Sequence, residues 1–124
     1  MDYHIETDDN AKIVLCTASG TLNIQNAEKI SLATNPKAYA LNYSVIYDLS
    51  QTHLAATIVD AYEFPRNRAA LFGAQNEMPK KIAIVYAPGK NIDFWRFYET
   101  TATNAGLILK VFDSVTKARE WCTA

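Results

Sequence analysis

An aspartate, a serine and a histidine lie close together at Asp48, Ser50 and His53. These residue types form the catalytic set of serine hydrolases, in which a base activates the serine hydroxyl. A nucleophilic serine also needs a strained turn, usually flanked by glycines, and an oxyanion hole. Here Leu49 and Gln51 flank the serine instead. We therefore expect Asp48 and Ser50 to fold a loop through Asx-type hydrogen bonds, and we expect no enzymatic activity.

Lys90 lies in the string Gly89-Lys90-Asn91, at the predicted start of a helix. The free backbone N–H groups at a helix N-terminus can hold an anion. The string lacks the spacing G-x-x-x-x-G-K-[ST] of a phosphate-binding loop. A turn followed by an N-cap is therefore the preferred interpretation, and a small anionic ligand is the alternative.

Aromatic residues gather in two segments, one around Tyr62 and one in the string Phe94-Trp95-Arg96-Phe97-Tyr98. Adjacent aromatic pairs span more than one face of a helix, so one member of each pair falls outside a normal apolar stripe. Exposed aromatic residues beside arginine are typical of protein interfaces. We therefore expect a surface for self-association or for a protein partner, formed by Tyr62, Trp95 and Tyr98 with Arg66, Arg68 and Arg96 nearby.

Length and composition indicate one folded domain without a charged partner. The chain has 124 residues, of which 49% are hydrophobic and 20% charged, which excludes a disordered chain. The net charge is −1, and no basic stripe suited to nucleic acid is visible. Neither a signal peptide nor an apolar run of membrane-spanning length is present, so we expect a cytoplasmic protein that does not insert into membranes.

The two cysteines and two histidines predict no metal site and no cofactor. Cys16 and Cys122 are far apart, without a C-x-x-C string or a Cys/His cluster. Cys16 lies in the apolar run 13–16, where a free cysteine acts as a small hydrophobic residue.

The first half of the chain predicts a β-hairpin followed by a helix and a buried strand. Residues 3–7 alternate apolar and polar side chains, and residues 11–19 follow as a second strand after a short turn. Asn23 can cap a helix of about ten residues. Asn35-Pro36 should end that helix, because a residue before proline avoids the α region.

Two later segments, 45–47 and 82–86, are continuously apolar, as expected for central parallel strands. Thr57 and Asp60 form a possible capping box for the helix between them. Pro65 should kink that helix or split it near Phe64. The apolar stripe of this helix comprises Ile58, Ala61, Tyr62, Pro65, Ala69 and Phe72.

The last third of the chain predicts two helices around a strand. Asn91 or Asp93 can cap the first helix, and Gly106 ends it. Residues 107–112 form the last strand, and Ser114 caps the final helix.

The predicted order is β-β-α-β-α-β-α-β-α, an α/β fold with a mostly parallel five-stranded sheet, an antiparallel first strand and four helices. Strands 45–47 and 82–86 are apolar on both faces, so a helix or a second subunit must cover the face that the other helices leave free. We favour a homodimer.

Several strings in this order resemble the STAS domain, the SpoIIAA-like fold of bacterial anti-sigma-factor antagonists, and in particular small uncharacterised STAS-like proteins of bacteria. The resemblance rests on the strings at residues 17–22, 35–39, 45–50, 97–99, 106–107, 110–114 and 118–121. It implies a regulatory or protein-binding module. The antagonists are switched by phosphorylation of a serine in a loop after the third strand; here residues 52–57 lack the serine pair and the glycine, and Thr57 is the nearest hydroxyl.

We therefore expect a non-enzymatic regulatory or protein-interaction module without the phosphorylatable serine loop. The alternative is a small-molecule or lipid-binding protein with a pocket between the second and third helices. The candidate binding residues are Asp48, Ser50, His53, Thr57, Tyr62, Arg66, Lys90, Trp95 and Tyr98.

Overall fold

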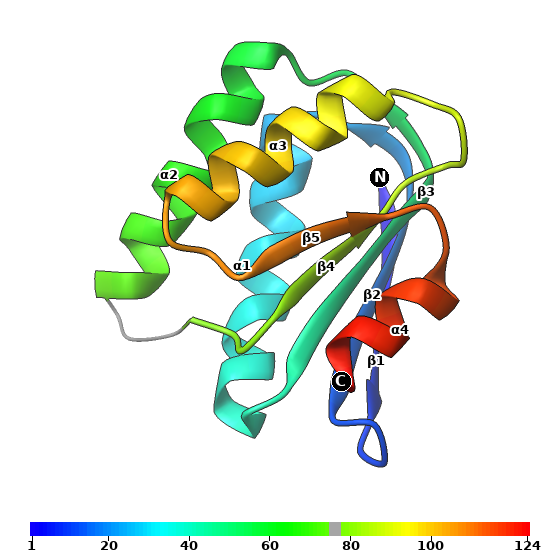
Figure 1. Cartoon of the computed structure of the whole chain (residues 1–124), viewed down its shortest axis with the longest axis vertical. Helices are drawn as coiled ribbons and strands as arrows, with labels where there is room; N and C mark the ends of the chain where they lie inside the picture. Colours follow the sequence, from blue (N-terminus) through cyan, green and yellow to red (C-terminus); the bar gives the residue numbers. More distant parts are fainter. Residues whose placement is uncertain (75–77) are drawn as a thin grey trace.

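The structure is a computed structural model that describes residues 1–74 and 78–124, apart from the side chains of residues 72–74. Over these residues the elements follow one another in the predicted order (Figure 1). They are β1 (Asp2–Asp8), β2 (Ile13–Leu22), α1 (Ile24–Leu41), β3 (Ser44–Leu54), α2 (Ile58–Ala74), β4 (Ile82–Val85), α3 (Ile92–Asn104), β5 (Leu109–Phe112) and α4 (Val115–Cys122).

The described strands form one mixed sheet in the order β1-β2-β3-β4-β5. β1 pairs antiparallel with β2, and the later neighbours are all parallel. The backbone N–H of Ala11 donates to Oδ1 of Asp8 at 3.1 Å and closes the turn between β1 and β2. The predicted α/β fold, with its mostly parallel sheet and antiparallel first strand, is confirmed.

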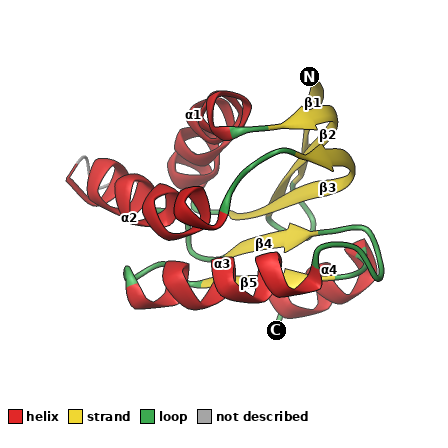
Figure 2. Ribbon diagram, turned by 90° about the horizontal axis from the view of Figure 1, so that it is seen from above, coloured by secondary structure: helices red, strands yellow, loops and turns green. Residues whose placement is uncertain are grey.

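Helices cover both faces of the sheet (Figure 2). On one side α1 packs on β2 and β3, α3 packs on β5, and α2 packs on α3. On the other side α4 packs on β3, β4 and β5. Because successive side chains of a strand point to opposite faces, Val45 and Tyr47 enter the first core while Ile46 enters the second. A helix of the same chain therefore covers the second face of the central strands, so the favoured alternative, a second subunit on that face, is wrong.

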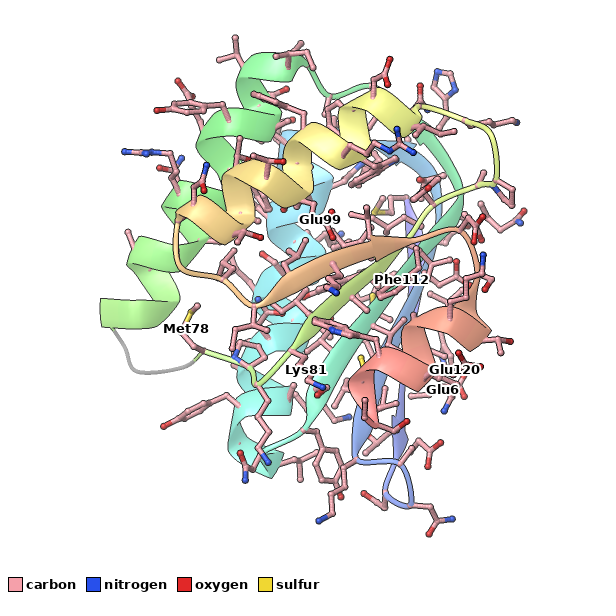
Figure 3. The ribbon with its side chains drawn as sticks, in the orientation of Figure 1. Glu6, Met78, Lys81, Glu99, Phe112 and Glu120 are labelled. Atoms are coloured by element: carbon pink, nitrogen blue, oxygen red, sulfur yellow. The ribbon has the colours of Figure 1, made fainter. Side chains whose placement is uncertain are left out.

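α4 is tied to the sheet by contacts around Trp121. Nζ of Lys81 donates to the Trp121 carbonyl at 2.8 Å, and the Trp121 ring lies 5.8 Å from the ring of Phe112. Lys81 and Phe112 are labelled in Figure 3. Nη1 of Arg119 also donates to Oδ2 of Asp8 at 3.0 Å, which links α4 to the β1–β2 hairpin. These contacts hold α4 on the second face.

α1 is longer than predicted, because it passes through Asn35-Pro36 and ends at Leu41. Pro36 has no N–H to donate to the carbonyl one turn earlier, that of Leu32. Leu32 is 51% exposed, so water can donate to this carbonyl instead. Beyond the proline, Ala38 is fully buried in the core. Asn42 then ends the helix in the left-handed conformation, with φ at 60°. Packing of the last turn outweighs the local effect of the proline.

β3 is also longer than predicted. The sequence predicts a strand at 45–47 followed by a loop with Asp48, Ser50 and His53, but all three residues lie within the strand. β4 pairs with β3 only as far as Asp48, and the remainder of β3 pairs with β2 up to Leu22. β2 accordingly continues beyond residue 19. The missed pairing is long-range, so no local pattern in residues 48–54 signals it.

α2 begins with the predicted capping box. The N–H of Thr57 donates to Oδ2 of Asp60 at 2.9 Å, and the N–H of Asp60 donates to Oγ1 of Thr57 at 3.2 Å. The helix continues through Pro65 as one element, so the split alternative is wrong. Pro65 cannot donate to the carbonyl of Ala61, and Oγ1 of Thr101 in α3 donates to that carbonyl at 2.6 Å instead. A side chain of α3 thus replaces the missing helical hydrogen bond.

The inner face of α2 differs from the predicted stripe. Ile58 and Tyr62 belong to the predicted stripe, but they are 56% and 48% exposed, and for Tyr62 this agrees with the surface that the sequence also predicts for it. Ala61 and Pro65 are buried as the stripe predicts, and Phe64, which is not part of the stripe, is buried as well. Phe72, a further member of the stripe, lies outside the side chains that the structure describes. Apolar residues occur on more than one face of this helix, so their spacing alone does not determine its rotation.

The remaining helix ends largely follow the prediction. Asn91 occupies the N-cap position of α3, but it is in the left-handed conformation and its side chain makes no capping hydrogen bond to the described residues. Gly106 follows α3 with φ at +95°, as expected of a glycine that ends a helix. Oγ of Ser114 accepts from the N–H of Lys117 at 3.2 Å, which confirms the predicted cap of α4.

Candidate functional site

A cavity of about 80 Å³ lies between the sheet and the helices α1, α2 and α3. α2 packs against α3 and stands away from the sheet, so the cavity lies beneath α2. Strands β3, β4 and β5 form its floor, with Tyr47, Ile84 and Leu109 among the lining residues. Met78, labelled in Figure 3, lines it just before β4. The lining is mostly apolar, as is typical of small-molecule sites.

Arg68 of α2 places a cation in this apolar lining. Its side chain is only 14% exposed, and its carbon Cζ lies 5.2 Å from the centre of the Phe64 ring. Within the part of the chain that the structure describes, Nε and Nη1 of Arg68 are buried without a hydrogen-bond partner. Nη2 lies 3.9 Å from Oε1 of the half-exposed Glu28, a weak ion pair. The guanidinium therefore has buried N–H donors that are available to a ligand in the cavity.

Two tyrosine hydroxyl groups lie within electrostatic reach of Arg68. The hydroxyl of Tyr47 donates to Oδ1 of Asn35 in α1, and both residues line the cavity. Burial raises the pKa of Tyr47 well above its ordinary value, and burial also raises the pKa of Tyr98, an effect that the Arg68 charge partly opposes. Both phenols are therefore neutral at physiological pH and can act as hydrogen-bond partners without adding charge.

Phe94, Trp95 and Tyr98 of α3 form a wall of the cavity rather than an outer surface. Trp95 is only 5% exposed, and its ring lies 5.0 Å from that of Phe94 and 5.6 Å from that of Tyr98. All three rings line the cavity. The predicted interface role of Trp95 is therefore wrong in its placement. The inward face of α3 brings Trp95 and Tyr98 into one site.

Tyr62 and Arg66 lie together on the exposed side of α2. The Arg66 guanidinium carbon lies 5.2 Å from the centre of the Tyr62 ring. Neither residue is among those that line the cavity. Ile58 and Val59, at the start of the same helix, are 56% and 61% exposed. Tyr62 and Arg66 thus lie at the surface as the predicted interface requires, and Ile58 and Val59 extend the exposed group beyond that prediction.

Asp48, Ser50 and His53 do not assemble a hydrolase site among the described residues. Oδ1 of Asp48 accepts from the N–H and from the hydroxyl of Ser50, at 3.1 and 2.6 Å. These bonds are the predicted Asx-type contacts, although they form within β3 and not in a loop. His53 is exposed near the end of β3, opposite Thr21 of β2. The serine hydroxyl is thus engaged with the aspartate.

Thr57 and Lys90 have the local roles that the sequence favoured. The Thr57 hydroxyl accepts the capping bond from Asp60, so it is engaged at the start of α2. Lys90 is exposed in the turn before α3, where its N–H donates to the carbonyl of Ala87 at 3.1 Å. Neither residue lines the cavity.

The cavity contains Arg68, which the sequence placed beside a surface interface, and also Asn35 and Tyr47, which the sequence did not single out as functional candidates. Arg68 follows Phe64 by four positions and Ala61 by seven, so it shares their helix face. A charged residue on a face that is otherwise buried is a signal that can be read once the rotation of the helix is known. Asn35 gave no such signal, because the proline after it suggested a helix end.

The described residues contain no group of three or more His, Cys, Asp or Glu side chains suited to a metal ion. None of the helices in the described part of the chain has the length and apolarity needed to cross a membrane.

Comparisons with known proteins identify the fold. Neither a protein-family model nor a curated protein matches the sequence. The structure is similar to the crystal structure of an uncharacterised protein of the DUF3478 family with a SpoIIAA-like fold, from Shewanella loihica PV-4. The two are 15% identical, the TM-score is 0.57, and the match covers 98% of this chain and 92% of the other. The SpoIIAA-like fold predicted from the sequence is therefore confirmed.

Proposed function

We propose that this chain is a non-enzymatic, cytoplasmic STAS-like module that binds a small ligand with an apolar body beneath α2. The cavity between the helices and the sheet is the observation that carries this proposal. Apolar cavities with a few placed polar groups are the usual form of small-molecule sites. Here the polar groups are Arg68, Asn35 and the two neutral phenols.

Binding fits these polar groups better than catalysis does. Arginine stays protonated, and the buried phenols hold their protons, so neither serves as a general base near neutral pH. Asp60 also lines the cavity, but its Oδ2 accepts the capping bond from Thr57. A regulatory module would then respond to occupancy of the cavity.

Native mass spectrometry of the purified protein tests the proposal. We expect a fraction of the protein to carry a co-purifying small molecule that denaturing conditions release. Ala61→Leu adds a larger side chain inside the cavity, where Ala61 is 1% exposed, and should abolish this fraction. Ala70→Leu on the exposed side of α2 is the matched control and should retain it. A ligand that persists unchanged in Ala61→Leu would place binding elsewhere.

Protein interaction is the second candidate, and it rests on the exposed group at the start of α2. Ile58, Val59 and Tyr62 expose apolar surface beside Arg66, a composition enriched at interfaces. We propose that this group mediates a homodimer or binds a protein partner.

Light scattering coupled to size exclusion measures the mass of the particle. We expect a dimer for the natural sequence and a monomer for Val59→Glu. Ile108→Glu, at an equally exposed apolar residue outside α2, should remain a dimer. A strict monomer at high concentration, together with no specific partner in a pull-down, would count heavily against this candidate.

A further inference from the structure

We infer that the ligand is a small monocarboxylate with a short apolar tail, and that Arg68 binds its head group. The inference rests on the proposed binding function and names the class of ligand. It starts from the guanidinium, whose Nε and Nη1 have no hydrogen-bond partner among the described residues. Burying such donors unpaired is unfavourable. Nε and Nη1 lie on different edges of the guanidinium, so a bound carboxylate would accept from one of them together with Nη2.

The surroundings of Arg68 favour a single negative charge. Glu28 lies on the Nη2 side at 3.9 Å and is half exposed, so it neutralises the guanidinium only weakly. Tyr47 and Tyr98 near it are neutral, and Asp60 lines the same cavity. Among the described lining residues Arg68 is the single cation, and Asp60 already accepts the Thr57 N–H, so the cavity suits a head group with no more than one negative charge. A phosphate monoester, which carries about −1.5 to −2 charges at neutral pH, would leave excess negative charge in an apolar site.

The cavity also limits the tail. Its volume of about 80 Å³ is far below the roughly 300–1,000 Å³ of sites for drug-sized ligands. Trp95, Phe94 and Leu109 line it with apolar surface. A tail of a few methylene groups therefore fits. Each added methylene should tighten binding about fourfold until the cavity is full, and longer tails should then gain nothing further.

Isothermal titration with hexanoate and 1-hexanol separates the head group from the tail. The two probes share the same tail, and only hexanoate offers a carboxylate to Arg68. We expect hexanoate to bind at least about tenfold more tightly than the alcohol. Arg68→Gln should remove that preference and leave binding of the alcohol within about twofold. Arg66→Gln is the matched control, because Arg66 lies on the exposed side of α2, and it should change neither affinity.

Two further measurements complete the test. Arg68→Lys keeps the charge but loses the planar fork, and it should retain only part of the preference. Amide NMR spectra of each variant establish that it is folded before titration.

The outcomes distinguish the two levels of the argument. Equal binding of hexanoate and 1-hexanol, or a preference that survives in folded Arg68→Gln, overturns the carboxylate and leaves the apolar site intact. If neither probe binds, nor butanoate or octanoate, the cavity is not a ligand site of this class and both inferences fall.

Discussion

Arg68→Met should make the protein more stable, although it removes a charged residue from the fold. Arg68 lies on the inner face of α2 with its side chain 14% exposed. Methionine has a similar unbranched stem and no polar hydrogen, so it can fill the same space without unpaired donors. The change therefore isolates the cost of the buried guanidinium.

The magnitude follows from the contacts of the guanidinium. Relief comes from Nε and Nη1, which are buried and unpaired among the described residues, at about 1–3 kcal/mol for each nitrogen. The loss is about 0.5–1 kcal/mol for the contact with the Phe64 ring and at most about 1 kcal/mol for the ion pair to the half-exposed Glu28. Relief of about 2–6 kcal/mol against a loss of about 0.5–2 kcal/mol should raise the free energy of unfolding by about 2–3 kcal/mol.

Urea unfolding followed by circular dichroism gives this free energy from the midpoint and the slope. Protein stripped of bound ligand is used, because a ligand that binds only the native state would stabilise the natural sequence alone. Arg66→Met serves as the control, since Arg66 is exposed, and it should change stability by no more than about 0.5 kcal/mol.

A destabilised Arg68→Met, by about 1 kcal/mol or more in ligand-free protein, would refute the reasoning. It would mean that the guanidinium has satisfactory partners in the native protein. The carboxylate inference would then fail as well, because it starts from guanidinium donors that lack a partner in the ligand-free protein.

Three other predictions concern the framework of the site. Thr101→Val removes the donor to the Ala61 carbonyl that Pro65 leaves free, and urea unfolding should show a loss of about 1–3 kcal/mol. The N–H of Ala11 and the Arg119 guanidinium lower the pKa of the Asp8 carboxyl below its ordinary 3.8. The ionised carboxylate therefore stabilises the fold above pH 3.8, and this stabilisation is lost as the pH falls through the pKa of the folded protein. Asp8→Asn should therefore be less stable than the natural sequence near pH 7, with a difference that shrinks near pH 2.5. Burial raises the pKa of the Cys122 thiol to about 11, and at pH 8 its alkylation by iodoacetamide should be about a hundredfold slower than that of an ordinary cysteine.

Each of these predictions has a control and a contrary result. Thr100→Val removes an exposed hydroxyl that bonds only within α3, and an equal loss there would show that the Ala61 contact is not special. A constant difference between Asp8→Asn and the natural sequence across the pH range would exclude linkage to that carboxyl. Full denaturation should restore ordinary Cys122 reactivity, and equally fast labelling of the native protein would contradict its burial.

The order of the elements along the chain and the antiparallel β1–β2 hairpin could be predicted because their signals are local. Continuous apolar runs at 45–47 and 82–86 mark strands buried on both faces, and the two cores on either side of the sheet confirm this. The caps at Thr57 and Ser114 were predictable for the same reason, since a cap involves residues three positions apart. Local chemistry is sufficient for these features.

The site could not be predicted in the same way, because distant residues determine it. The continuation of α1 past Pro36 depends on the core that buries Ala38. The rotation of α2 depends on α3, whose Thr101 holds the Ala61 carbonyl. A helix with apolar residues on several sides gives no rotation from its period alone, and the cavity beneath it appears only when that rotation is known.

The position of Arg68 connects stability with function. A fold that needed only a well-packed interior would be better served by an apolar residue at this position, because a buried guanidinium with unpaired donors lowers stability. The same donors become favourable when an anion occupies the cavity. The two Arg68 experiments should therefore give results of opposite sign: removing the cation strengthens the empty protein and weakens its binding of a carboxylate. If Arg68 were purely structural, its removal would lower the free energy of unfolding and leave the preference for hexanoate over 1-hexanol unchanged. The change in stability and the change in binding preference, measured together, therefore distinguish a ligand-binding arginine from a structural one.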